Sequence, residues 1–269
     1  DTSVKWLLYA GLASLQLAFM RYASHFVISI FTIARGGISR DRFATDHLRL
    51  VLFRAFLLVS ATALNFIVLR YLSLTVVSAI MFSAPIVVCL LSWPMLGEKV
   101  GPWRWFAIGL GFLGVMVVIR PFGENYHWAA LLTCYNAIAL ALYSILTRRL
   151  AGIVATETMQ FYMGLLGTVS LLPMAIWTWV TPQTLFEWGL LCCLGVWAWG
   201  GHELLTRAHG LAPANTLMPY TYSFLIFLTI ESYLVFADIP DQWTLTGAAI
   251  IMLSGLIIWK RAEIREADV

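Results

Sequence analysis

One uninterrupted apolar run limits what this chain can fold into more than any other feature. Between Arg70 and Glu98 lie 27 residues with no Asp, Glu, Lys, Arg or His, including "SAIMFSAPIVVCLLSWPMLG". A helix needs about 20 mainly apolar residues to cross the hydrocarbon core of a bilayer. The run is long enough to cross, and its two prolines need an explanation.

Composition extends this interpretation to the whole chain. Of the 269 residues, 61% are hydrophobic and 12% are charged, against about 25% charged in a typical soluble domain. Apolar runs follow one another with short polar breaks. The sequence therefore predicts an all-α polytopic membrane protein that has the lipid bilayer as its immediate partner.

Ten apolar segments can be counted along the chain, and nine of them are long enough to cross a membrane. The short first segment indicates a helix that begins before Asp1. The predicted segments are Asp1–Leu12, Ser14–Phe31, Leu50–Leu69, Leu74–Leu96, Trp103–Ile119, Trp128–Thr147, Thr156–Val180, Leu185–Thr206, Pro213–Val235 and Trp243–Trp259.

The basic residues predict the orientation. If the loop Gly36–Arg49 faces the cytoplasm, all but four of the 17 Lys and Arg residues lie at that side. The exceptions are Lys5, Arg21, Arg70 and Arg120. Cytoplasmic loops of membrane proteins carry an excess of Lys and Arg. We therefore expect both termini in the cytoplasm. The net charge of +3 is too small and dispersed for nucleic-acid binding.

A weak internal repeat is visible when the sequence is compared with itself. At a shift of 140 residues, Trp103 aligns with Trp243, Ala107 with Gly247, and Gly114 with Ser254. Five segments per half is an odd number, so the halves, residues 1–121 and 122–269, would cross the membrane in opposite directions. Inverted repeats are a recurring design of secondary transporters.

Several stretches resemble a known family. The segments "LGEKVGPWRWFAIGLGFLGVMVVIRP" and "PYTYSFLIFLTIESYLVFADIP", with the opening "DTSVKWL" and "LQLAFMR", are similar to the EamA-type branch of the drug/metabolite transporter superfamily. Within that branch the chain looks most like bacterial exporters of aromatic and other amino acids. The resemblance implies ten helices around a central cavity that opens alternately to each side, in the bacterial inner membrane. It implies no cofactor.

Polar residues inside the segments are candidates for substrate contact. A shift of 137 residues aligns Asn65 with His202 and Met81 with Met218. Polar groups among adaptable apolar ones suit a small-molecule site; ordinary interhelical hydrogen bonds are the alternative. The predicted substrate-binding residues are Asn65, Met81, Ser83, Tyr135, Trp197, His202, Tyr220 and Tyr222.

Other residues receive different predictions. Pro85 and Pro219 interrupt helices that would pack inside the bundle, where freed backbone groups can be satisfied. Glu231 and His202 are possible proton-coupling groups. Glu203 and Arg207 have the spacing of a helical ion pair. Arg21 and His25 share a helix face, with a structural pairing favoured over carboxylate binding.

Function follows from these observations. The leading hypothesis is a secondary carrier that exports amino acids with broad selectivity, including Thr, Met and aromatic ones. The alternative keeps the fold and changes the cargo to a nucleotide sugar, a purine or a cationic drug. Motifs of intramembrane enzymes and ATP-driven pumps are absent from the sequence, so an enzyme is not expected. The coupling ion and oligomeric state stay open.

Overall fold

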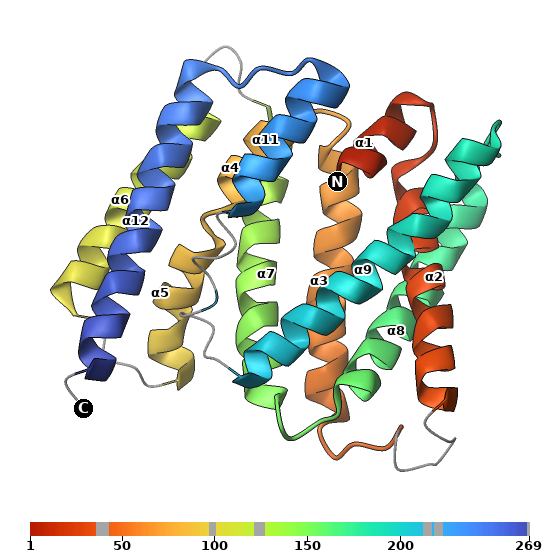
Figure 1. Ribbon diagram of the computed structural model, residues 1–269, viewed down its shortest axis with the longest axis horizontal. Helices are drawn as coiled ribbons and strands as arrows, with labels where there is room; N and C mark the ends of the chain where they lie inside the picture. Colours follow the sequence, from red (N-terminus) through yellow and green to blue (C-terminus); the bar gives the residue numbers. More distant parts are fainter. Residues whose placement is uncertain (36–42, 97–100, 121–126, 212–216, 218–222, 268–269) are drawn as a thin grey trace. The chain divides into compact units, whose positions relative to one another are not determined.

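The structure is a computed structural model that describes residues 1–35, 43–96, 101–120, 127–211, 217 and 223–267. These residues form helices, with no strand among them (Figure 1). In chain order the helices are α1 (Thr2–Tyr9), α2 (Ser14–Arg35), α3 (Leu48–Val68), α4 (Leu74–Met81), α5 (Ala84–Leu96), α6 (Pro102–Ile119), α7 (Ala129–Leu150), α8 (Thr156–Trp177), α9 (Leu185–Leu211), α11 (Ser223–Phe236) and α12 (Gln242–Ala267).

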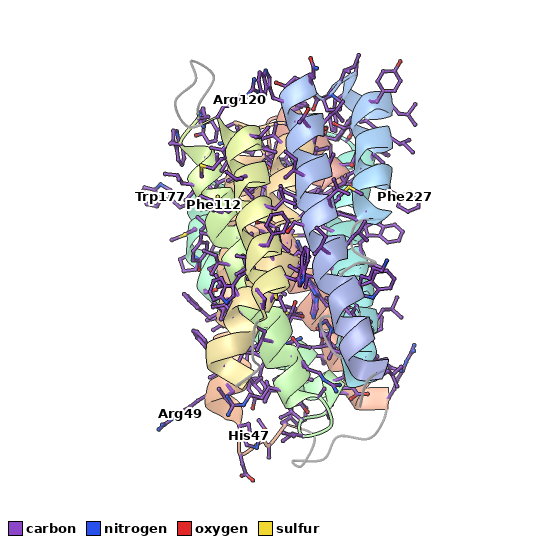
Figure 2. The ribbon with its side chains drawn as sticks, turned by 90° about the vertical axis from the view of Figure 1, so that its left-hand side faces the viewer. His47, Arg49, Phe112, Arg120, Trp177 and Phe227 are labelled. Carbon is purple, nitrogen blue, oxygen red and sulfur yellow. The ribbon has the colours of Figure 1, made fainter. Side chains whose placement is uncertain are left out.

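These helices confirm an all-α membrane protein. Six segments of the described residues are long and apolar enough to cross a bilayer: Ser14–Arg35, Leu48–Val68, Leu74–Leu91, Ala129–Leu150, Thr156–Trp177 and Gln242–Lys260. Large apolar side chains such as Phe112 and Phe227 are 61% and 63% exposed (Figure 2). Such exposure is normal where lipid is the solvent.

The predicted segment Leu74–Leu96 consists of two helices. α4 begins after Ser73, whose hydroxyl caps the helix by accepting a hydrogen bond from the Val76 N–H. The chain turns at Phe82 and Ser83, and α5 begins at Ala84. Pro85 therefore lies in the first turn of α5, where its missing N–H costs no helical hydrogen bond. Figure 1 shows the break between α4 and α5.

The helices pack into two compact units. Unit 1 contains residues 3–70 and 146–211, and unit 2 contains residues 71–145 and 212–269, with Asp1 in unit 1 and Thr2 in unit 2. Each unit draws helices from both of the predicted sequence repeats. A packing boundary and a repeat boundary are different properties, so the division at residue 121 stays a prediction.

Unit 2 is built on the contact between α6 and α12, which lie side by side (Figure 1). The Ser254 hydroxyl donates a hydrogen bond to the Ala107 carbonyl. Further along α6, a Cβ on Gly114 would lie 2.9 Å from the Gly247 carbonyl oxygen. Because Ala107 meets Ser254 and Gly114 meets Gly247, the helices are antiparallel. The small side chains at these positions allow the two helices to pack closely.

The apolar core of unit 2 surrounds this helix pair. It gathers buried side chains from α4, α5, α6, α7 and α12: Ala79, Ile80, Phe82, Ile86, Cys89, Ala107, Val115, Val118, Ile119, Ala130, Ala248, Ile251 and Ile258. In unit 1 a smaller cluster of Val51, Leu150, Val154 and Met159 joins the start of α3, the end of α7 and the start of α8.

Candidate functional site

Three helices of unit 1 meet closely around the middle of α2, and glycines make the approach possible. A Cβ on Gly164 of α8 would lie 2.8 Å from the Cα of Phe26. On α9, a Cβ on Gly195 would lie 2.7 Å from the backbone nitrogen of His25 and 2.9 Å from the carbonyl oxygen of Arg21. Small residues permit such close approach between membrane helices. The polar residues of α2 are therefore held directly against α8 and α9.

Arg21 of α2 contacts His202 of α9, with 3.2 Å between Nη2 and Nε2. A guanidinium can only donate hydrogen bonds, so Nε2 of His202 accepts and the imidazole carries its proton on Nδ1. The Arg21 guanidinium also lies 5.8 Å from the Phe66 ring centroid, within the range of a cation–π contact. The structure thus gives Arg21 a partner on another helix.

His25 lies one turn after Arg21 and is fully buried beside Gln160 of α8. The backbone and the side chain of Gln160 both approach the His25 ring, but neither ring nitrogen has hydrogen-bond geometry to a partner among the described residues. The Gln160 amide nitrogen donates to Glu203 Oε2 at 3.4 Å, while its carbonyl oxygen has no partner in that same part of the chain. Buried polar atoms without partners are uncommon and mark places of functional interest.

Glu203 carries the carboxylate of this region. Its Oε1 accepts hydrogen bonds from Arg207, at 2.8 Å from both Nε and Nη2. The predicted ion pair is confirmed. Arg207 therefore compensates the negative charge of Glu203, and Gln160 adds an uncharged hydrogen-bond donor.

Arg54 of α3 is a fully buried arginine that the sequence analysis placed among the cytoplasmic basic residues. Its Nε donates to the Thr147 hydroxyl at 2.7 Å and its Nη2 to the Thr206 hydroxyl at 3.2 Å. These bonds fasten α3 to the end of α7 and to α9. The helical spacing of Arg54 from the buried Val51 and Leu58 is a signal that could have indicated its burial.

The predicted substrate-binding residues are distributed over both units. Unit 1 holds Asn65, Trp197 and His202. Asn65 donates from Nδ2 to Asp1 Oδ1 at 3.4 Å, and Trp197 is 70% exposed. His202 contacts Arg21 through a hydrogen bond.

Unit 2 holds Met81, Ser83, Tyr135, Pro85 and Glu231. The first two flank the break between α4 and α5, and Ser83 is buried. Glu231 is exposed on α11 and accepts a hydrogen bond from the Thr2 hydroxyl. The remaining predicted residues, Tyr220, Tyr222 and Pro219, lie outside the described residues.

An ion pair fastens α6 to α12 at the point where both helices leave the apolar core. Arg120 Nη2 lies 2.6 Å from Asp241 Oδ2, and the Thr244 N–H donates to Asp241 Oδ1 at 2.8 Å. Partial desolvation raises the pKa of Asp241, but the hydrogen bonds from Thr244 and the positive charge of Arg120 outweigh it. The net effect lowers the pKa of Asp241 below its ordinary value.

The polar residues of unit 1 form a cluster whose charges limit its chemistry. The cluster consists of Arg21, His25, Arg54, Gln160, His202 and Glu203. Arg21 and Arg54 are permanent cations, and the carboxylate of Glu203 is shared with Arg207. Within the described ranges no three His, Cys, Asp or Glu side chains are grouped to hold a metal ion. The cluster is suited to binding an anionic or hydrogen-bonding group.

Comparison with known proteins gives a consistent result. Residues 3–120 match the model of the EamA-like transporter family. The riboflavin transporter of Vibrio cholerae is 30% identical over 258 residues, which cover 95% of this chain and 86% of that protein. The S-adenosylmethionine uptake transporter of Rickettsia bellii is 32% identical over 184 residues, covering 68% and 63%.

Two further similarities cover most of the chain. The pseudopaline exporter CntI of Pseudomonas aeruginosa is 24% identical, with 91% of this chain and 86% of the exporter aligned. A crystal structure superimposes with a TM-score of 0.70 at 15% identity, covering 96% of this chain and 93% of the other. The latter similarity concerns the fold alone.

Proposed function

Because the chain belongs to the EamA-like transporter family, we propose that it carries small nitrogen-containing metabolites that bear a carboxylate, with amino acids of broad selectivity as the first class. The chain is a secondary transporter of small metabolites in a membrane, and not an enzyme. Of the resemblance to amino-acid exporters, this proposal keeps one feature, the carboxylate that the substrates would share.

The observation that carries the proposal is the contact between Arg21 and His202. An ionisable residue at membrane depth is costly and marks a functional site. Arginine presents a planar fork of donors that matches a carboxylate. An imidazole beside it supplies a further donor or acceptor. One of the named relatives takes up S-adenosylmethionine, which contains an amino-acid carboxylate.

The proposed substrate contacts extend beyond this pair. We retain Asn65, Met81, Ser83, Tyr135, Trp197, Tyr220 and Tyr222 as proposed contacts, with Pro85 and Pro219 as the residues that shape their helices. The methionine and the aromatic rings would accept varied side chains, because thioether and aromatic groups adapt to different apolar shapes.

We also propose that the two halves are inverted repeats. The contact between α6 and α12 supports this. Ala107 aligns with Gly247, and Gly114 with Ser254; Ala107 contacts Ser254, and Gly114 contacts Gly247. Ala107 thus contacts the residue equivalent to Gly114, and Gly114 contacts the residue equivalent to Ala107. Such a reciprocal pair of contacts is what a two-fold axis between the two halves would produce. Because the two helices are antiparallel, the proposed axis would lie in the membrane plane.

Orientation and direction belong to the same proposal. The bias of Lys and Arg favours cytoplasmic termini in a bacterial inner membrane. From there, amino acids would move outward along their gradient. A cysteine introduced at Gly123 that reacts with an impermeant reagent only from the cytoplasm would contradict this orientation.

A second substrate class is favoured by one observation. Similarity to the Vibrio cholerae riboflavin transporter extends over 95% of this chain. Riboflavin lacks a carboxylate and would be recognised through its ring and hydroxyl groups. The two classes therefore make different demands on Arg21.

Liposomes containing the purified protein test the proposal. We expect radiolabelled L-methionine, L-threonine and L-phenylalanine to enter faster than into empty liposomes, and Arg21→Gln to reduce that entry at least tenfold. Gln keeps polarity but loses the charge and the donor fork. Rapid uptake of riboflavin with no uptake of any of the three amino acids would refute the carboxylate class and support the second one.

A further inference from the structure

We propose that the pair of Arg21 and His202 binds one proton together with each substrate carboxylate, which makes transport proton-coupled. This inference rests on the proposed function and adds to it the coupling ion and the residue that carries it. The geometry of one hydrogen bond is its starting point.

In the structure the pair carries no additional proton, because the His202 ring is neutral. Arg21 Nη2 lies 3.2 Å from His202 Nε2, and Arg21 can only donate. Nε2 must therefore offer its lone pair, so the ring is neutral. A proton on Nε2 would remove this acceptor and place an imidazolium directly against a guanidinium.

A carboxylate changes which form of the pair is stable. With a carboxylate between them, Arg21 and a protonated Nε2 of His202 can both donate to its oxygens in charge-assisted hydrogen bonds. The proton comes from water, bonds to Nε2 and returns to water when the carboxylate leaves. The pair thus has two self-consistent states, one with neither proton nor carboxylate and one with both.

The charges around the pair favour joint binding. Arg21 of α2 and Arg54 of α3 act on His202 as permanent positive charges, and the neutral His25 of α2 also lies close to it. On α9 itself, Glu203 is adjacent in sequence and is bound to Arg207. α8 contributes Gln160, which is uncharged. Positive charge therefore predominates, and a proton becomes favourable at His202 when a negative group accompanies it.

Thermodynamic linkage converts this into a measurable prediction. If a carboxylate favours the proton, the proton favours the carboxylate by the same factor. For one linked proton, the dissociation constant of the substrate rises up to about tenfold per pH unit where His202 must be protonated for binding. A zwitterionic amino acid moved with one proton also carries one positive charge across the membrane. Outward movement along the substrate gradient would therefore move a proton outward too, and an inward proton gradient would oppose export and favour uptake.

L-methionine is the probe, and L-methioninol, which replaces its carboxylate with a hydroxymethyl group, is the matched control ligand. We expect about one proton to be taken up per bound L-methionine in weakly buffered detergent solution and none with L-methioninol. In liposomes, an inwardly directed proton gradient should accelerate uptake of L-methionine.

Variants assign the proton to a residue. His202→Gln keeps a hydrogen-bond acceptor for Arg21 but cannot titrate, so binding should weaken and lose its pH dependence. His209→Gln is the matched control, because His209 is a buried histidine of the same helix that bonds to the Leu205 carbonyl instead. It should keep the pH dependence. His25→Gln should keep it too.

The outcomes separate the two proposals. Transport of L-methionine with no proton uptake, or a pH dependence lost in His25→Gln and kept in His202→Gln, would overturn the coupling and leave the function intact. No transport of any carboxylate substrate would refute the function and the coupling together. If His202→Gln does not fold, the comparison of L-methionine with L-methioninol on the unaltered protein still decides.

Discussion

Gly195 should be the position where one methyl group does most damage to the candidate site. A Cβ there would lie 2.2 Å from the Cβ of Ser24 and 2.7 Å from the backbone nitrogen of His25, whereas ordinary contacts begin at 3.4 Å. Backbone atoms cannot turn away, so Gly195→Ala must push α9 from α2. We expect the bond between Arg21 and His202 to lengthen as a result.

A matched control allows the magnitude to be worked out. Gly189 lies on the same helix, and a Cβ there would meet nothing within 4 Å. Replacing Gly by Ala inside a helix contributes up to about 1 kcal/mol through backbone propensity, and this gain applies to both positions. Overpacking costs about 1–3 kcal/mol. Gly195→Ala should therefore be about 1–3 kcal/mol less stable than Gly189→Ala.

The assay is unfolding by SDS in mixed micelles, followed by circular dichroism, with the dissociation constant of L-methionine as a second measurement. We expect Gly195→Ala to unfold at lower SDS and to bind more weakly, while Gly189→Ala unfolds at the same or higher SDS and binds normally. Equal stability of the two variants would show that α2 and α9 are not in the close contact described.

Three further predictions concern other contacts. Arg54→Ala should lower the free energy of unfolding by about 3 kcal/mol, because hydrogen bonds to a charged group contribute about 1.5–3 kcal/mol each; full stability in this variant would mean that the buried guanidinium fastens nothing. Tyr22→Phe should cost about 0.5–1.5 kcal/mol by removing the buried bond to Thr62 at 2.9 Å, and an unchanged unfolding midpoint would argue against that bond. The lowered pKa of Asp241 predicts that its pair with Arg120 stabilises the fold above about pH 4, the unfolded pKa of Asp, and that this stabilisation is lost as pH falls through the lower folded pKa. The stability difference between the unaltered protein and Asp241→Asn should therefore shrink on acidification, and a constant difference would contradict the pairing.

The sequence by itself determined the properties that depend on local composition and spacing. Long apolar runs required membrane helices, because a backbone in lipid must satisfy its own hydrogen bonds. The four-residue spacing of Glu203 and Arg207 placed them on one helix face, and their ion pair is present. The weak repeat aligned Ala107 with Gly247 and Gly114 with Ser254, and these small residues lie where α6 and α12 approach each other.

Tertiary structure decided which distant residues meet. Nothing local pairs Arg21 with His202, which are 181 residues apart; the pairing depends on how α9 crosses α2 at Gly195. Likewise, Arg54 has the sequence position of a cytoplasmic charge, yet it is buried because Thr147 and Thr206 supply acceptors from two other helices. Helix periodicity determines which face of a helix a residue occupies, but only tertiary packing determines what that face contacts.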